Sequence, residues 1–276
     1  MTVRYQKYSP TGNITVLVTT AVPRDRQPEV AAWLLKPEVA GGEQVGFVEP
    51  PTDPRCAARL QMMGGEFCGN ATMALGAMLA RNAGLADGAE KALLLEVSGS
   101  ANPVACRICR EGEEWVGTVD MPLPERFESA MLETDGGPLT APLVRMQGIA
   151  HLILPVAEAP GEAELHRRLP QWNRRIGADA LGALTWNADE SSIDPLVYVP
   201  SAGTLVREHG CGSGSAALGS WLAVRDRQGR AVAVRQPGGV ITAVARLRDG
   251  AVSALSITGR VTLVAEGTAE VGDAQW

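Results

Sequence analysis

The chain has 276 residues, 45% of them hydrophobic, and a formal net charge of −6, which suits one large domain or two ordinary ones with sizeable apolar cores. Without a long run of like charges, nucleic acid is not expected as a partner, and no stretch approaches the roughly 18 to 20 apolar residues of a membrane span. No apolar signal-peptide core follows Met1, and the five widely spaced cysteines suit reduced thiols, so we expect a cytoplasmic protein.

Alternation of apolar and polar residues predicts a series of short strands. In chain order these are residues 14–18, 93–97, 104–108, 115–119, 152–155, 196–199, 232–234 and 240–244. Segments rich in Ala, Leu and Met after Cys68 and Cys211 predict two helices, and Gly84 is suited to end the first. The stretch from Pro122 to Pro142 has little periodicity, so we expect the join between two halves of the chain there.

The two predicted helices begin with the same pattern. Six of twelve positions are identical, without a gap, between Gly-Asn-Ala-Thr-Met-Ala-Leu-Gly-Ala-Met-Leu-Ala after Cys68 and Gly-Ser-Gly-Ser-Ala-Ala-Leu-Gly-Ser-Trp-Leu-Ala after Cys211. Residues 12–18 match 148–154 more loosely, as do 97–100 and 236–239, in the same order. The series indicates internal duplication. We expect an α+β protein with two pseudo-symmetric domains, residues 1–128 and 129–276, each a strongly curved sheet around one central helix.

Cys68 and Cys211 each lie at a glycine-rich junction that opens a helix. The first amides of a helix have no partners within it and, with the helix dipole, attract anions. A substrate carboxylate can bind there, and a thiol there ionises more easily. If pseudo-twofold symmetry brings both junctions to one cleft, a substrate meets a thiol on either face. One base then removes an α-proton and an acid on the other face returns one, while the pair shares a single proton.

Each candidate has a purely structural interpretation as well. A buried cysteine usually behaves as a small hydrophobe, and this is our interpretation of Cys56, Cys106 and Cys109. His151 lies in an apolar strand, where a hydrogen-bonded structural role is favoured over a catalytic one. His209 either lowers the pKa of the neighbouring thiol or is a solvated loop residue. The histidines and acidic residues show no metal-ligand spacing, so no metal is expected.

The motifs, taken together, resemble the diaminopimelate epimerase superfamily, which includes proline racemases and other cofactor-independent isomerases. The closer likeness is to the histidine racemases of staphylopine-type metallophore biosynthesis. It rests on segments that span nearly the whole chain: Ser9–Asn13, Glu43–Phe47, Glu66–Met73, Val97–Gly99, Cys211–Gly214 and Gln236–Gly239.

The resemblance implies two domains, each a barrel-like sheet around a central helix, with the site between them and the last strand returning to the first half. It implies Cys68 and Cys211 as the catalytic pair, no pyridoxal phosphate or other cofactor, and no metal. The residues that would hold the amino acid's carboxylate are Asn13, Gly69, Asn70, Gly212, Ser213 and Gly214. Glu208 would meet its ammonium, and Glu43 and Gln44 are candidates to line the side-chain pocket, with an exposed loop pair as the alternative. A homodimer is expected because family members are often dimers.

Two departures bear on the substrate. The segment Glu208–Cys211 is short and lacks the Arg that follows the Glu in diaminopimelate epimerase, and Ala71–Met73 replaces that enzyme's Arg and second Cys. These changes count against a substrate such as diaminopimelate, which carries a second carboxylate far from the reacting carbon. We therefore expect a cofactor-independent racemase that interconverts L- and D-histidine for opine-type metallophore biosynthesis. The alternatives are an epimerase of diaminopimelate or another diamino acid, and an amino-acid-binding protein without turnover.

Overall fold

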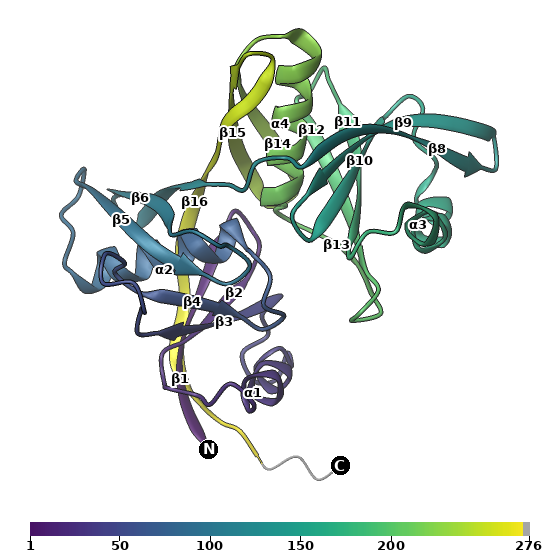
Figure 1. The fold of residues 1–276 in the computed structure, drawn as a ribbon. Coiled ribbons are helices and arrows are strands. Elements are labelled where there is room, and N and C mark those ends of the chain that lie inside the picture. The colour runs from purple at the N-terminus through teal and green to yellow at the C-terminus, as the bar shows by residue number, and fades with distance from the viewer. Residues whose placement is uncertain (273–276) are drawn as a thin grey trace. The chain divides into compact units, whose positions relative to one another are not determined.

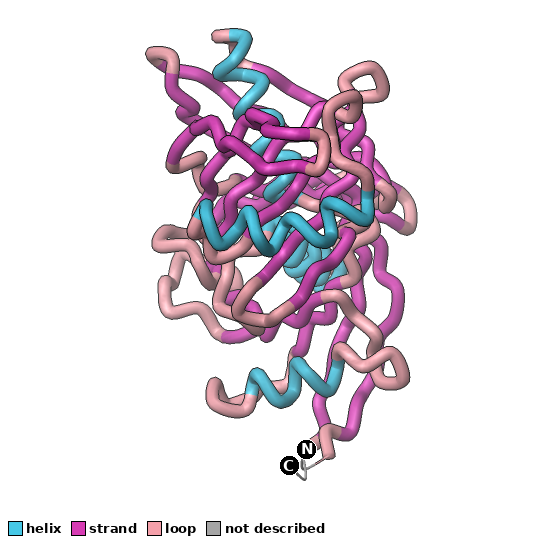
Figure 2. The backbone as a smooth tube through the Cα atoms, turned by 90° about the vertical axis from the view of Figure 1, so that its right-hand side faces the viewer, coloured by secondary structure: helices cyan, strands magenta, loops and turns pink. Residues whose placement is uncertain are grey.

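The computed structural model describes residues 1–272 and is a sheet-dominated mixture of α and β structure (Figure 2). It divides into two compact units, one of residues 1–120 with the chain from 258 onward, the other of residues 121–257. The division after residue 120 differs from the boundary after residue 128 drawn from the sequence. No helix among the described residues is long and apolar enough to cross a membrane.

The first unit consists of strands that follow one another in space as they do along the chain, with a central helix α2 and a short peripheral helix α1 (Figure 1). The strands are β1 (Thr2–Pro10), β2 (Thr15–Val18), β3 (Gln44–Glu49), β4 (Arg59–Met62), β5 (Glu90–Val97), β6 (Val104–Glu111), β7 (Glu114–Asp120) and the later part of β16 (Ala251–Glu270). β16 pairs with both β7 and β1. The helices are α1 (Gln27–Leu34) and α2 (Gly69–Asn82). Nearly every residue of α2 is buried, against β1, β2, β5, β6 and β7.

The second unit repeats this plan around helix α4. Its strands are β8 (Arg126–Thr134), β9 (Gly137–Met146), β10 (Ile149–Pro155), β11 (Leu181–Asn187), β12 (Ser192–Val199), β13 (Thr204–Arg207), β14 (Arg230–Gln236), β15 (Gly239–Arg248) and the start of β16. The strand order is β15-β14-β12-β11-β10-β9-β8, with β13 paired to β12. The helices are α3 (Glu162–Ile176) and α4 (Gly212–Asp226). α4 packs on β9, β10, β14 and β15.

Parallel strand pairs occupy corresponding places in the two units and position the candidate site. β2 and β3 are parallel with Thr15 opposite Gln44, and β10 and β11 are parallel with His151 opposite Gly182. Because residues in register on neighbouring strands point to the same face, Thr15 and Gln44 present adjacent side chains to one side of the first sheet, whereas in the second unit His151 lies beside a glycine.

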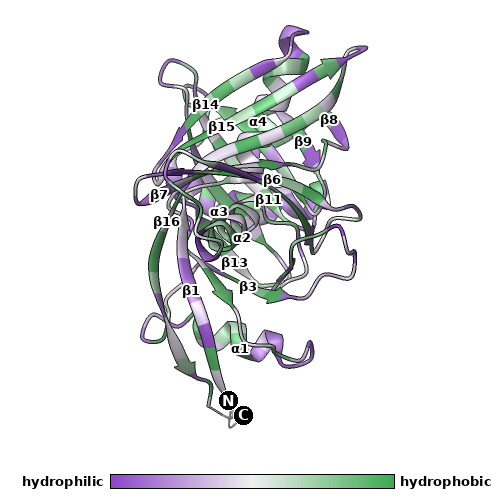
Figure 3. Ribbon diagram, turned by 90° about the vertical axis from the view of Figure 1, so that its left-hand side faces the viewer, coloured by the Kyte–Doolittle hydropathy of each residue, from purple (hydrophilic) through white to green (hydrophobic). Residues whose placement is uncertain are grey.

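The periodicity predicted half of the strands, since the expected ranges overlap or fall within β2, β5, β6, β7, β10, β12, β14 and β15. Figure 3 shows bands of alternating hydropathy along strands such as β1 and β15. The expected aperiodic join at residues 122–142 is wrong, because β8 and most of β9 lie there. β8 has one buried residue, Leu132, and so carries little apolar alternation. One helix for each half was also too few, because α1 and α3 pack outside the central helices.

Candidate active site

Cys68 and Cys211 occupy the same position, the N-cap, at the start of the two central helices. Both have an extended backbone, with φ −134° and ψ 109° at Cys68 and φ −99° and ψ 100° at Cys211. Each sulfur accepts a hydrogen bond from the backbone N–H three residues later, from Ala71 at 3.4 Å and from Gly214 at 3.3 Å. Ser, Thr, Asp or Asn usually supplies this cap. A sulfur in this position lies at the positive end of a helix, which favours the thiolate.

A hydroxyl on the first turn anchors the carbonyl of each cysteine. Thr72 Oγ1 donates to Cys68 O at 2.7 Å, and Ser215 Oγ donates to Cys211 O at 2.9 Å. Both hydroxyls come four residues after the cysteine. The two helix starts are therefore built alike at the backbone, in agreement with the duplication inferred from the sequence.

Three of the predicted site residues meet in the first unit: Cys68, Gln44 and Asn13. The thiol of Cys68 donates to Gln44 Oε1 at 3.1 Å, while Gln44 Nε2 donates to Asn13 Oδ1 at 2.6 Å and to Thr15 Oγ1 at 2.8 Å. These two acceptors assign the orientation of the Gln44 amide. Its oxygen therefore faces Cys68, and the first unit presents a hydrogen-bond acceptor to this thiol.

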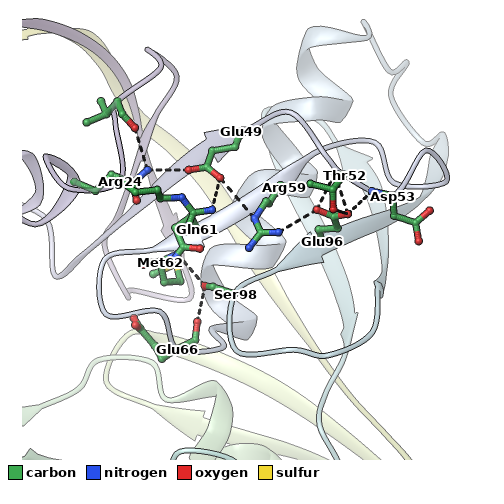
Figure 4. A network of polar contacts seen from close by, with 12 residues as sticks. Arg24, Glu49, Thr52, Asp53, Arg59, Gln61, Met62, Glu66, Glu96 and Ser98 are labelled. Carbon is green, nitrogen blue, oxygen red and sulfur yellow. Dashed lines mark hydrogen bonds and ion pairs between the residues drawn. The ribbon is translucent and has the colours of Figure 1, made fainter.

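The loop before the second cysteine is held by Gln236, to which the sequence assigned no role. Gln236 Oε1 accepts from Cys211 N at 2.6 Å, and its Nε2 donates to Ser215 Oγ at 2.8 Å. In the first unit, Ser98 Oγ accepts from Met62 N at 2.9 Å and donates to Glu66 O at 2.8 Å (Figure 4). The match of residues 97–100 with 236–239 was the signal that could have pointed to both.

His151 is fully buried on β10 and contacts the first turn of α4. Its Nε2 lies 3.0 Å from Ser213 Oγ, and Ser213 Oγ lies 3.6 Å from Cys211 Sγ. Burial lowers the pKa of His151 to about 3, so its ring is neutral at ordinary pH. It is hydrogen-bonded, as expected, and its partner is one of the predicted site residues.

Cys211 is buried, and its surroundings act on its thiol in opposite directions. Burial raises the pKa of Cys211 well above its ordinary value, and the Glu208 carboxylate raises it further through its charge and a hydrogen bond. Hydrogen bonds from Ser213 and from the Gly214 amide lower it. Since burial is the largest effect, Cys211 is held mainly as a thiol, and any group that neutralises Glu208 or donates to the sulfur favours ionisation.

The remaining predicted residues form the first helical turns. Gly69 and Asn70 open α2, and Gly212, Ser213 and Gly214 open α4. At Gly214 a Cβ atom would lie 2.8 Å from Leu184 Cδ2 and 3.0 Å from Cys211 Sγ, so glycine leaves room for the thiol. Within residues 1–272, no three His, Cys, Asp or Glu side chains are grouped so that they could hold a metal ion.

The other three cysteines have surroundings typical of structural residues. Cys56 and Cys106 are buried and Cys109 is half-buried, and none of the three is in a disulfide. Burial raises the pKa of Cys106 to about 12, so this thiol stays protonated. Along β6 the side chains of Cys106 and Cys109 lie on opposite faces, one buried and one more exposed.

A second polar network in the first unit is internally compensated and has no thiol in it (Figure 4). Arg59 lies between two carboxylates, 3.6 Å from Glu49 and 3.3 Å from Glu96. Glu49 also pairs with Arg24 at 2.6 Å, and Glu96 accepts from Thr52 N at 3.0 Å. These contacts brace β3, β4 and β5 and the hollow beside them, which residues 52–53, 59 and 96–103 line.

Comparison with known proteins finds a matching family and relatives that align over nearly the whole chain. The family model described as the histidine racemase CntK N-terminal domain matches residues 2–270. The chain is 30% identical over 277 residues to the histidine racemase of Staphylococcus aureus (strain Mu50 / ATCC 700699), covering 98% of both chains. It is 29% identical over 271 residues to the histidine racemase of Fusobacterium nucleatum subsp. nucleatum (strain ATCC 25586), covering 96% of each.

Among solved structures, the fold matches that of a hydroxyproline epimerase from Agrobacterium vitis with bound trans-4-hydroxy-L-proline. The TM-score is 0.73 at 18% sequence identity, over 97% of this chain and 92% of that one. At this identity the likeness establishes the architecture.

Proposed function

We propose that this chain, which belongs to the family of histidine racemase CntK N-terminal domains, interconverts L- and D-histidine through Cys68 and Cys211. The chain is an isomerase of the racemase and epimerase kind. What we propose beyond this is that histidine is the substrate and that Cys68 and Cys211 are the catalytic groups. The observation that carries it is the repeated geometry of the two thiols, each the N-cap of a central helix and each hydrogen-bonded to a first-turn amide.

In the proposed reaction, one cysteine thiolate takes the α-proton from one face of the amino acid. The electron pair of the broken C–H bond passes into the carboxylate, and the other cysteine gives its thiol proton to the opposite face. The substrate leaves inverted, and the pair retains one proton on the other sulfur. The first-turn amides of α2 and α4 are suited to hold the carboxylate as negative charge develops on it.

The same proposal assigns the remaining polar groups. Glu208 receives the substrate ammonium, and this pairing offsets the carboxylate charge that raises the pKa of Cys211. Asn13 and Gln44 are proposed to line the substrate site from the first unit. The hydrogen bond between these two side chains, together with the one that joins Gln44 to Cys68, supports a position beside the reacting group. No cofactor takes part in the proposed steps.

The finer expectations from the sequence belong to this proposal. They are a barrel-like sheet around α2 and around α4, membership of the diaminopimelate epimerase superfamily, a cytoplasmic enzyme, and D-histidine made for opine-type metallophore biosynthesis. The contacts of α2 and α4 with strands of their own units support the first. The names of the curated relatives support histidine as the substrate.

The test is to follow optical activity with the purified full chain and no added cofactor. L-Histidine and D-histidine should each lose their signal and reach the same equimolar mixture by chiral chromatography. LL-Diaminopimelate and trans-4-hydroxy-L-proline should react at least ~100-fold less efficiently in kcat/KM, because a site that pairs one polar group rejects analogues that leave it unpaired. Comparable turnover of LL-diaminopimelate would restore the alternative substrate. Binding of histidine with no loss of optical activity would refute the proposal.

A further inference from the structure

The two thiols have different polar neighbours although their backbones are alike. Cys68 faces the accepting oxygen of Gln44, which extends from β3. At the corresponding place in the second unit, β11 carries Gly182, and the polar group comes instead from His151 on the adjacent β10. In the repeat, His151 corresponds to Thr15, whose hydroxyl accepts from Gln44. The polar side chain near the cysteine therefore comes from β3 in the first unit and from β10 in the second.

Glycine at position 182 leaves the space that the His151 ring needs. A Cβ atom built on Gly182 would lie 2.3 Å from His151 Nδ1, so any side chain there would displace the ring. The imidazole occupies that space, fully buried. Its strand neighbours, Val144 on β9 and Gly182 on β11, bring no charged group to it.

The surroundings of the ring fix its tautomer. Nδ1 is buried and has no hydrogen-bond partner among the described residues, whereas Nε2 lies 3.0 Å from Ser213 Oγ. A buried N–H without an acceptor is rarer in proteins than an acceptor without a donor. The neutral ring therefore carries its proton on Nε2 and donates it to Ser213 Oγ. With that oxygen accepting from the histidine, the Ser213 hydroxyl proton is available for Cys211 Sγ, 3.6 Å away.

We propose that His151 is a positioning residue for Cys211, and that it acts through Ser213 by directing the hydroxyl proton toward the sulfur. The inference rests on the proposed function and deepens it, because it concerns which of the two sulfurs carries the proton that the cysteine pair shares. Gln44 accepts a hydrogen bond from the Cys68 thiol and favours its protonated form, whereas Ser213 donates a hydrogen bond to Cys211 and favours its thiolate. Among the described residues, Glu208 is a charged group that faces Cys211, and its carboxylate opposes ionisation until a cation pairs with it.

The test titrates one cysteine at a time in the full chain without substrate, by the ultraviolet absorbance of the thiolate. Cys211 is read in a Cys68→Ser background after subtraction of the Cys68→Ser/Cys211→Ser protein, and Cys68 is read in the reciprocal way. Serine is a good N-cap residue and preserves both helix starts. His151→Phe and Ser213→Ala should each raise the Cys211 midpoint by roughly one pH unit, a tenfold loss of thiolate below the midpoint. The Cys68 midpoint should stay where it is.

Two further variants separate positioning from general damage. Ser220→Ala removes another buried α4 hydroxyl, one without a hydrogen-bond partner in the described residues, and should leave the Cys211 midpoint unchanged. His151→Gln retains an N–H donor, so it should raise the Cys211 midpoint less than His151→Phe does. In the Ser213→Ala background, His151→Phe should add nothing further, because the two act in series.

An unchanged Cys211 midpoint in Ser213→Ala, which removes only an oxygen, would overturn the proposal even if His151→Phe did not fold. So would equal shifts in Cys68 and Cys211. The titration needs no turnover, so its outcome stands apart from the histidine assay. A wild-type protein that fails to racemise histidine would refute the proposed function, and the Cys211 midpoints would still decide this inference.

Discussion

Gln44 Oε1 lies 3.1 Å from Cys68 Sγ, and the nitrogen of the same amide is engaged by Asn13 and Thr15. The amide cannot turn its nitrogen toward the thiol without losing both of those hydrogen bonds. Gln44 therefore presents a fixed acceptor to Cys68, and the charge of the residue at this position should set how readily this thiol ionises.

Replacing Gln44 by Glu tests this relationship. A carboxylate beside Cys68 disfavours the thiolate, so the pKa of Cys68 should rise. The acidic limb of the kcat/KM profile for histidine should move upward by roughly one pH unit in both directions of the reaction. Gln61→Glu is the matched control, because Gln61 is a half-buried residue on neighbouring β4 whose amide donates to Met62 O. A Gln44→Glu profile that overlays that of Gln61→Glu would contradict the role given to Gln44.

If the two N-cap cysteines act as proposed, single replacement of either should abolish racemisation and leave half of the proton chemistry. Cys68→Ser and Cys211→Ser should each lose kcat by orders of magnitude, since a serine hydroxyl is far too weakly acidic to replace a thiolate. In deuterated water each variant should still exchange the α-proton of one enantiomer, with opposite preferences in the two variants. Mass spectrometry of recovered L- and D-histidine measures this exchange.

The wild-type enzyme should place deuterium mainly on the inverted product in the same solvent. Cys109→Ser, a change at a half-buried cysteine of β6, serves as the control and should behave as wild type. Racemisation near the wild-type rate by either folded N-cap variant would show that a single cysteine suffices, and the two-thiol mechanism would be wrong.

The elements that could be predicted were those whose pattern is local. Strand alternation and the repeated helix start lie within a few residues of one another, so β6, β15 and the two N-cap cysteines were evident from the sequence. β8 was missed because it has little buried surface and thus no apolar period. The eight-residue helix α1 was missed because it is short and follows a Pro-containing turn.

The contacts that shape the candidate site could not be predicted, since they depend on register between distant segments. Gln44 and Cys68 are 24 residues apart, and His151 and Ser213 are 62 apart. Each contact requires a parallel strand pair in one register, which a single sequence does not specify. The role of Gly182 is visible only when the ring of His151 is seen to fill the space above it.

Burial of His151 should make the protein acid-sensitive in a defined pH range. Its pKa is about 3 in the folded chain, below the ordinary 6.5, so the unfolded chain binds the proton first. The stability linked to this residue is fully present above about pH 6.5 and is lost as pH falls toward 3. Between pH 7 and 4 the Tm of His151→Gln should therefore fall less steeply than that of wild type.

His166→Gln is the control, because it makes the same change at an exposed position on α3, away from the buried ring of His151. Differential scanning calorimetry at several pH values gives the slopes directly. Equal slopes for His151→Gln and wild type would mean that the buried ring is protonated in the folded state, contrary to the neutral tautomer inferred above.

Gly214 should be intolerant of even a methyl group. Its amide hydrogen-bonds to Cys211 Sγ at 3.3 Å, and an added Cβ would lie 3.0 Å from that sulfur and 2.8 Å from Leu184 Cδ2. Gly214→Ala should displace the thiol by a few tenths of an ångström and lower kcat at least roughly tenfold, because small misplacements of a reacting group are costly. KM for histidine should change less than kcat.

Gly161→Ala is the matched control, since Gly161 also lies at a helix start, that of α3, with open space where the methyl group would be. It should alter stability slightly and leave kcat unchanged. A Gly214→Ala enzyme with wild-type kcat would show that the sulfur position set by the first turn of α4 does not limit the reaction.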